Sequence, residues 1–389
     1  MKILHASRES RADYRYGMGR ANAMLLDGLK QIGMSADFMY GSDLDMDSIR
    51  RVTSWTEKLA KILPRTLCPV LYAIVAAWET GRMAGRRAIA QSYTHLHCHD
   101  AVVAAGARAE LHGHPVVWGI SQHGYSCVSR ALHQYVHPLP YWCRAVLWCW
   151  ERKVVSAASW IICPTASGRT NLALELKLSI DIRWHAIPHP RPVLNLPDKN
   201  DARHFLKWES GLRYILAVGQ LIPLKRFEHI IDAMASLPNN CRLVILGDGD
   251  KSPYLSRAAS LGLVPPVITS VDRISPYLAA ADIFVSASLT ESFGMAILEA
   301  MTADLPIICT RVGGVADVVG DAAELVNPNC SDLASRLEYL ITNPAHCMDL
   351  AMKCGIRARK WPDRQAVARQ YLQIYQNCYS TVIPSLNQR

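Results

Sequence analysis

The sequence predicts an α/β protein built from two Rossmann-like domains, and three observations support this prediction. Short apolar segments with strand character alternate with helix-forming segments along most of the chain, which is typical of parallel sheets covered by helices. A segment with four prolines, 187–200, interrupts the alternation and favours extended backbone between two domains. The chain has 389 residues, half of them hydrophobic, which is enough for two separate cores.

The first domain is expected to span 1–190. A strand at 2–6 opens it, and a helix at 21–32 follows, ended by Gly33 as a C-cap. The remaining elements of this domain are expected as strands at 94–97, 115–120, 160–163 and 182–187 and as helices at 100–111, 141–157 and 166–177.

The second domain is expected to span 191–362, with a second alternating series. Its strands are expected at 214–218, 242–246, 266–269, 282–286 and 305–309, and its helices at 227–236, 252–261 and 274–280 and after Glu291. A third segment, 363–389, begins with a helix over 363–379 that has one apolar face.

The charge and the cysteine content limit the possible partners and the cellular compartment. A net charge of +9 and a pI near 9.0 favour an anionic partner: a phosphorylated sugar, an anionic lipid headgroup or a nucleic acid. No nucleic-acid-binding motif is recognisable, so we expect no nucleic acid partner. Twelve cysteines are scattered without a C-x-x-C pair, which suits core thiols in a reducing cytosol.

The apolar segments are too short to cross a bilayer. The longest, 70–78, is less than half of the roughly 20 residues that a spanning helix needs, and the N-terminus has the pattern of a strand and not of a signal peptide. We therefore expect a cytoplasmic protein that touches the inner face of the membrane at most.

The segment 286–301 is the one around which the function is predicted. An apolar strand ends before it, and a polar turn leads into a helix that opens near Phe293. The first amides of such a helix have no intrahelical partner, and its dipole is positive there. Gly294 lacks a Cβ, so a phosphate or a sugar hydroxyl can approach the backbone closely.

Two glutamates bracket this turn, with seven residues between them. Because carboxylates accept hydrogen bonds from hydroxyls, Glu291 could hold a sugar and Glu299 a ribose, with a diphosphate between them at the helix start. The spacing alone equally allows Glu291 to be an acid that stabilises the helix dipole and Glu299 to be a solvated helix residue.

The complete string at 288–301, Ser-Leu-Thr-Glu-Ser-Phe-Gly-Met-Ala-Ile-Leu-Glu-Ala-Met, resembles the E-x7-E segment of the retaining GT-B glycosyltransferases of family 4. The resemblance implies that Glu291 meets the donor sugar and that Glu299 holds the ribose. It also implies that the backbone amides of Phe293, Gly294 and Met295 meet the sugar and phosphate. It is strong from about 210 to 320 and looser before that, and it implies that the two domains face a central cleft.

A second candidate donor segment follows the strand at 214–218. It contains Gly219, Gln220, Lys225 and Arg226. The similar family has Gly-Arg-Leu followed by Lys here, and its Arg and Lys together clamp the donor diphosphate. Lys225 matches this pattern, but Gln220 replaces the arginine, so the clamp loses a bidentate cation. Arg226, next to Lys225, could compensate, which the spacing does not show. By itself, Lys225 could also be a solvated lysine.

Glycines also precede the first helix of the first domain. Gly17 and Gly19 superficially suggest a dinucleotide fingerprint, but the loop from Ser7 is too long and the third glycine is missing, so a dehydrogenase is not expected. In the similar family a glycine-rich loop at this place faces the donor phosphates and the acceptor, which makes both glycines candidate donor-binding residues.

Histidines mark two strand ends. His95, His97 and His99 alternate and could share one face, but no further metal ligands are evident and the similar family has such a strand without metal, so no metal is expected. His123 follows the strand at 115–120, at the sheet edge where ligands bind in such folds. The resemblance implies that it contacts the donor sugar.

Aromatic residues mix with Arg and Lys in two segments, 55–87 and 138–153. Interfacial membrane helices have this composition, and so do core helices with snorkelling cations, so both remain open. The resemblance further implies that the last helix, 363–389, crosses back onto the first domain. The alternative is a helix that completes the second domain.

The expected function follows from the resemblance. It is a retaining, metal-independent transfer of a sugar from a nucleotide-diphosphate donor to a saccharide or lipid-linked acceptor, in polysaccharide or glycoconjugate biosynthesis, without a cofactor. His123, Glu291 and Lys225 are the candidate catalytic residues. Two alternatives are kept: a nucleotide-sugar epimerase of the same fold, and a catalytically silent partner subunit, which Gln220 suggests.

Overall fold

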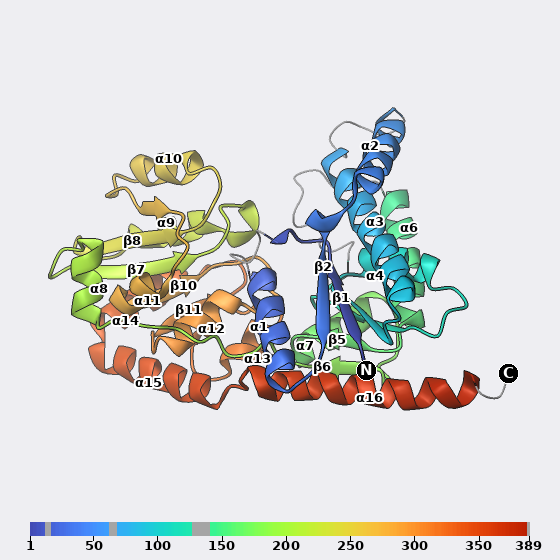
Figure 1. Ribbon diagram of the computed structural model, residues 1–389. Coiled ribbons are helices and arrows are strands. Elements are labelled where there is room, and N and C mark those ends of the chain that lie inside the picture. The colour runs from blue at the N-terminus through green and yellow to red at the C-terminus, as the bar shows by residue number, and fades with distance from the viewer. Residues whose placement is uncertain (12–16, 62–67, 127–140, 387–389) are drawn as a thin grey trace. The chain divides into compact units, whose positions relative to one another are not determined.

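The structure is a computed structural model that describes residues 1–11, 17–61, 68–126 and 141–386. The chain forms two compact units, which we call unit 1 (Met1–Pro190 with Pro362–Arg389) and unit 2 (Arg191–Trp361). Each unit contains one parallel six-stranded sheet with helices around it (Figure 1). The predicted α/β class with two Rossmann-like sheets is confirmed.

The sheet of unit 1 has the strand order β2-β1-β3-β4-β5-β6, and its neighbouring strands are parallel. Its strands are β1 (Ile3–Ser7), β2 (Ala36–Tyr40), β3 (His95–Cys98), β4 (Val117–Ser121), β5 (Ile161–Cys163) and β6 (Trp184–Ala186). The central strands β1 and β3 are buried on both faces, with apolar side chains alternating with the buried histidines His5, His95 and His97, as expected where helices cover a sheet on both sides.

Seven helices belong to the described part of unit 1. They are α1 (Gly17–Gln31), α2 (Met46–Ala60), α3 (Cys68–Ala90), α4 (Ala101–Glu110), α6 (Tyr141–Ala157), α7 (Ala166–Glu175) and α16 (Arg364–Leu386). Helix α1 begins at Gly17 and not near Ala21, so Gly17 and Gly19 lie in its first turn and not in a loop before it. This start was mispredicted because two glycines disfavour a helix locally, and propensity is a weak guide where tertiary packing decides.

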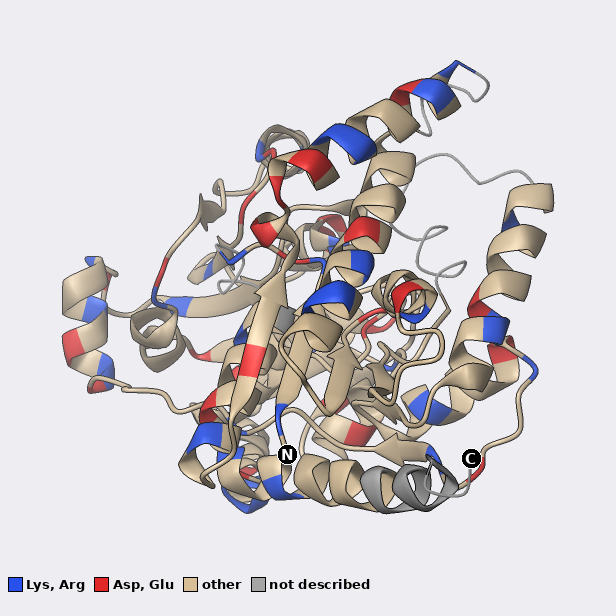
Figure 2. Cartoon of the chain, turned by 45° about the vertical axis from the view of Figure 1, so that its right-hand side comes forward, with Lys and Arg blue, Asp and Glu red and all other residues tan. Residues whose placement is uncertain are grey.

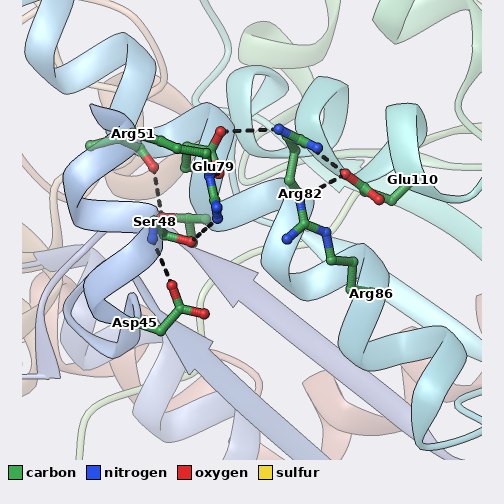
Figure 3. A network of polar contacts seen from close by, with 9 residues as sticks. Asp45, Ser48, Arg51, Glu79, Arg82, Arg86 and Glu110 are labelled. Carbon is green, nitrogen blue, oxygen red and sulfur yellow. Dashed lines mark hydrogen bonds and ion pairs between the residues drawn. The ribbon is translucent and has the colours of Figure 1, made fainter. Parts of the chain in front are cut away.

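A polar network joins α2, α3 and α4 (Figure 3). Buried Glu79 on α3 accepts hydrogen bonds from Arg51 on α2 at 3.3 Å and from Arg82 at 3.2 Å. Arg82 and Arg86 both donate to Glu110 at the end of α4, at 2.6 and 3.2 Å. A buried carboxylate is stable only when it is paired and hydrogen-bonded, so this network fixes the orientation of α2 on α3.

Helix α16 packs on the sheet and on α1 within unit 1. Arg364 pairs with Asp27 of α1 at 2.5 Å. The backbone carbonyl of buried Tyr375 lies 3.0 Å from His95 Nε2, and its hydroxyl lies 2.8 Å from His97 Nδ1. The end of the chain is therefore part of unit 1, although 171 residues of unit 2 precede it in the sequence.

The sheet of unit 2 has the order β12-β11-β10-β7-β8-β9 and is also parallel. Its strands are β7 (Arg213–Val218), β8 (Cys241–Leu246), β9 (Val267–Thr269), β10 (Ile283–Ser286), β11 (Ile307–Thr310) and β12 (Glu324–Val326). Strands β7, β10 and β11 lie in the middle, so the loops at their carboxyl ends meet at one edge of the sheet.

The helices of unit 2 are α8 (Lys199–Leu206), α9 (Phe227–Met234), α10 (Ser252–Ser260), α11 (Ser275–Ala280), α12 (Met295–Thr302), α13 (Val315–Val319), α14 (Leu333–Thr342) and α15 (Pro344–Lys360). Helices α9 to α12 agree with the predicted series to within a few residues, whereas α8, α13 and α14 were not predicted. Among the described helices of both units, none combines the length and apolar character that a membrane span requires.

Candidate functional site

The loop between β10 and α12 ends in a helix start without a side-chain cap. Gly294 is the N-cap of α12 and has a left-handed backbone with φ of +86°, which favours glycine because a Cβ is strained there. A Cβ at this position would also lie 2.8 Å from Ile297 Cδ1. Because glycine has no side chain to accept from the first amides of α12, these donors are not satisfied by the N-cap.

Glu291 and Lys225 form an ion pair beside this helix start. The Lys225 ammonium donates to Glu291 Oε2 at 2.5 Å, and each side chain is about one-fifth exposed. The two residues are 66 positions apart in the sequence, and the loops after β7 and β10 bring them together. Leu289 N–H donates to the carbonyl of Leu224 at 2.8 Å and joins the same two loops.

A third loop, after β11, contacts the backbone of Glu291. The Gly314 N–H donates to the Glu291 carbonyl at 2.9 Å. A Cβ on Gly313, whose φ is +50°, would lie only 2.0 Å from that carbonyl oxygen. The close approach of two backbones, which only glycine permits, therefore holds Glu291 in place.

The other predicted residues in and next to α12 are buried: Glu299 as a carboxylate, and Phe293 and Met295 as core side chains. Glu299 is 3% exposed, so the alternative of a solvated helix residue is wrong. The Phe293 ring is buried and packs edge-on against Trp361 at 5.8 Å, and Met295 is buried as well. Phe293 and Met295 side chains therefore belong to the core of unit 2, and what they can offer a ligand is backbone.

The segment after β7 places its candidate residues in three different environments. Gly219 lies against the Lys225 side chain, since a Cβ on it would be 3.2 Å from three of the lysine carbons. Gln220 is exposed. The Arg226 guanidinium donates to the carbonyl of Pro328, so at least one of its donors is used by the loop after β12.

His123 lies in unit 1, just after β4. Its ring is half-buried and stacks on Tyr125 at 6.0 Å. It lines a pocket at the carboxyl edge of the sheet, together with residues that follow β3, β5 and β6 and with side chains of α1 and α16. Gly17 and Gly19 lie one helical turn before the α1 residues of this pocket.

The histidines of β3 tie elements of unit 1 together. Besides its contact with Tyr375, His97 hydrogen-bonds to Ser121 Oγ at 2.7 Å through Nε2, and His99 hydrogen-bonds to His5 at 3.0 Å. Burial lowers the pKa of His5 to about 3 and that of His95 to about 4, so these rings are neutral near pH 7. Within the described ranges, no group of three or more His, Cys, Asp or Glu side chains is arranged to hold a metal ion.

Several polar residues of the unit 1 pocket were not predicted from the sequence. They are Asn22 on α1, Gln122 after β4 and His189 after β6. His189 and Gln122 follow strands, which is the only signal that was available. Asn22 carries no such signal because only the packing of α1 brings it to the sheet edge.

Solved structures of low sequence identity share the fold. Sucrose-phosphate synthase from Thermosynechococcus elongatus superposes with a TM-score of 0.75 at 17% identity, covering 98% of this chain and 100% of that one. Anabaena HepE in complex with UDP-glucose has a TM-score of 0.72 at 14% identity, covering 97% and 100%. The chain therefore has the two-domain α/β architecture of GT-B proteins.

One family model matches a part of the chain that lies in unit 2. Residues 198–361 match the family model described as glycosyl transferases group 1. D-inositol 3-phosphate glycosyltransferase from Pseudarthrobacter chlorophenolicus is 29% identical over 225 residues, which is 54% of this chain and 54% of that protein. The chain thus spans about half the length of this curated relative.

Proposed function

We propose that the protein is a retaining glycosyltransferase of family 4. It moves a sugar from a nucleotide-diphosphate donor to a saccharide or lipid-linked acceptor in polysaccharide or glycoconjugate biosynthesis. The observation that supports this best is the Lys225–Glu291 ion pair next to the start of α12, which has no side-chain cap, in a domain that matches the group 1 family model. A lysine cation, a carboxylate and the amides at a helix start together match the chemistry of a sugar diphosphate.

In this proposal the donor diphosphate binds at the start of α12. The amides of Phe293, Gly294 and Met295 donate to phosphate oxygens, which the positive end of the helix dipole favours. Lys225 turns from Glu291 to the phosphate, which leaves the Glu291 carboxylate able to accept from a sugar hydroxyl. That HepE was solved with UDP-glucose supports a nucleotide sugar as the ligand class.

The remaining donor contacts come from two neighbouring segments and from unit 1. Buried Glu299 binds the ribose hydroxyls, while Gly219, Gln220 and Arg226 lie next to the diphosphate. From unit 1, Gly17 and Gly19 contribute backbone of the first turn of α1, and His123 takes the contact with the donor sugar that the family resemblance gives it.

The proposed chemistry is front-face transfer with retention of configuration. The bond between the anomeric carbon and the diphosphate breaks, the acceptor hydroxyl attacks from the same face, and the leaving phosphate oxygen accepts the hydroxyl proton. Lys225 and the α12 amides stabilise the charge that grows on the leaving phosphate, which is the role a metal ion plays in other transferases. No protein nucleophile, metal or cofactor takes part.

Incubation with UDP-, GDP- and ADP-sugars tests this proposal. We expect slow hydrolysis of one donor, release of the nucleotide diphosphate, and a product with the anomeric configuration of the donor. Lys225→Met should lower the rate about 100-fold, the usual effect of removing a donor to a developing anion. The matched control is Lys251→Met, at an exposed lysine before α10, which should leave the rate unchanged.

The same panel separates the alternatives. Isomerised donor without transfer would indicate a nucleotide-sugar epimerase. Absence of any nucleotide-sugar binding would indicate a catalytically silent subunit, and inverted product configuration would contradict the retaining mechanism.

We also propose that unit 1 contacts an anionic membrane surface at the cytoplasmic face. Unit 1 has 25 Lys and Arg against 15 Asp and Glu, whereas unit 2 has 17 against 18, so the positive charge of the chain resides in unit 1. A donor diphosphate alone would favour positive charge on unit 2. The excess on unit 1 therefore points to a second anionic partner.

The surface proposed for this contact is formed by α2, α3 and α6. Helix α2 packs on α3, and the ring of Trp150 on α6 lies 6.5 Å from that of Trp78 on α3. Lys and Arg are drawn blue in Figure 2. Large apolar side chains are exposed on all three: Trp55, Tyr72, Tyr141, Trp142 and Val146. Tyr141 is 85% exposed at the start of α6, where a core helix would bury it. Exposed aromatics with nearby Arg and Lys are typical of helices that lie at a lipid interface.

Sedimentation with vesicles tests the membrane contact. We expect binding to vesicles of phosphatidylglycerol and phosphatidylcholine that weakens at high salt, and little binding to phosphatidylcholine alone. Trp142→Ser should weaken binding several-fold. The control is Phe205→Ser, at an aromatic on α8 of unit 2 that is 73% exposed. Equal loss in both variants, or binding independent of lipid charge, would contradict the proposed surface.

A further inference from the structure

The pocket of unit 1 has a lining without formal charge. Its polar side chains are Asn22, His99, Ser121, Gln122, His123, His189 and Tyr371. None of the described lining residues is Asp, Glu, Lys or Arg, and the rest of the wall is apolar, with Leu25, Ile162 and Val367. Burial lowers the pKa of His189 to about 4 and also lowers that of His99. Both imidazoles are therefore neutral near pH 7, so the pocket has little to attract a phosphate.

Three of these polar side chains already form hydrogen bonds inside unit 1. Gln122 donates its amide to buried Glu151 at 3.2 Å. Ser121 Oγ forms a hydrogen bond with His97, and His99 Nε2 forms one with His5, as described above. What these three residues can still offer a ligand is limited.

Asn22 differs from them. It lies on α1 with 4% of its surface exposed, and within the described parts of the chain its amide nitrogen Nδ2 has no hydrogen-bond partner. An unpaired buried amide costs roughly 1 to 3 kcal/mol, so proteins rarely keep one without a use. The residue also lines the pocket, which is where a ligand could pair with the amide.

We propose that Asn22 is a specificity-determining residue that donates a hydrogen bond to an uncharged oxygen, a hydroxyl or an acetamido carbonyl, that a bound sugar inserts into the pocket of unit 1. The inference rests on the proposed function in that it takes the ligand to be a sugar. The uncharged lining then selects neutral sugars over phosphorylated ones, because a phosphate placed here would lose its hydration without gaining a cation. The free space in the pocket is about 20 Å³, which has room for such a group and not for a whole sugar ring.

The variant that separates a ligand contact from a structural role is Asn22→Leu, which keeps the volume and removes the amide. An unpaired amide contributes no stability, so the variant should unfold at the same temperature as the wild type or at a higher one. A structural role predicts the opposite. Met24→Leu, at a buried α1 residue outside the pocket lining, is the matched control for repacking of the helix.

Binding is measured by NMR saturation transfer on the full chain. The probes are methyl α-glucoside, methyl α-mannoside and N-acetylglucosamine, with glucose 6-phosphate as the charged comparison. We expect at least one neutral probe to bind better than glucose 6-phosphate, and Asn22→Leu to weaken its binding about tenfold, the effect of one hydrogen bond. Met24→Leu should bind like the wild type.

Three results would overturn the proposal. They are a lower unfolding temperature of Asn22→Leu, unchanged affinity of this variant for the neutral probes, and failure of the wild type to prefer any neutral probe. Binding of UDP, GDP and ADP is followed in the same samples. If the wild type binds none of the three nucleotides, the proposed function is contradicted. If nucleotide binding is retained and only Asn22→Leu loses sugar binding, the result supports the role of Asn22 in the pocket.

Discussion

Acid should destabilise unit 1 because it buries neutral histidines. His5 and His95 are fully buried and have pKa values of about 3 and about 4, against about 6.5 in an unfolded chain. The unfolded state therefore binds more protons than the folded state between those values. Stability from these groups is fully present above about pH 6.5 and is lost as the pH falls towards 4 and 3.

The magnitude follows from the pKa values. Between pH 7 and pH 5 each of the two histidines removes about 2 kcal/mol of folding free energy, so together they remove about 4 kcal/mol. This is a large share of the roughly 5 to 15 kcal/mol that stabilises a typical domain. His97 and His99, whose pKa values burial also lowers, act in the same direction.

Urea unfolding at pH 7, 6 and 5, followed by tryptophan fluorescence, measures this effect. Buried Trp160 reports on unit 1, since its ring lies 6.0 Å from that of His95. His95→Gln keeps a donor for the Tyr375 carbonyl but cannot titrate, so its loss of stability from pH 7 to 5 should be about 2 kcal/mol smaller than in the wild type. His114→Gln, at an exposed position, is the control. Equal stability of the wild type at pH 7 and pH 5 would refute the reasoning.

Three further substitutions test the remaining conclusions. Glu299→Ala should weaken nucleotide-sugar binding about tenfold, as loss of a hydrogen bond to a charged acceptor implies, and unchanged affinity in calorimetry would contradict the ribose role. Gly313→Ala should lower both unfolding temperature and donor hydrolysis more than Gly262→Ala, because both have positive φ but only the first places a Cβ against the Glu291 carbonyl; equal effects would argue against that contact. Glu79→Ala should cost about 3 kcal/mol in urea unfolding because it leaves Arg51 and Arg82 short of a partner, whereas Lys353→Ala on exposed α15 should change nothing measurable.

Local sequence predicted most of the elements. Helix α6 has the predicted bounds, and the strands and helices of unit 2 from β7 to α11 begin and end within two residues of the prediction. Each has its own period of apolar residues, ended by glycine, proline or a polar turn, so neighbours in sequence suffice. Strands β2 and β12 were not predicted, and their pairing with β1 and β11 lies outside their own sequence, whereas the edge strands β6 and β9 have apolar residues that did predict them.

The candidate site also combines features that the local sequence predicts with features that only the tertiary structure decides. The sequence by itself determined the turn with Gly294 and the spacing of Glu291 and Glu299, since all three belong to one strand-turn-helix segment. Only the tertiary structure decided that Glu291 meets Lys225, that Gly313 supports its backbone, and that Asn22 lies buried at a pocket. The first two contacts join loops that parallel strands bring to one edge at their carboxyl ends, and Asn22 reaches its pocket through the packing of α1, neither of which a local pattern encodes.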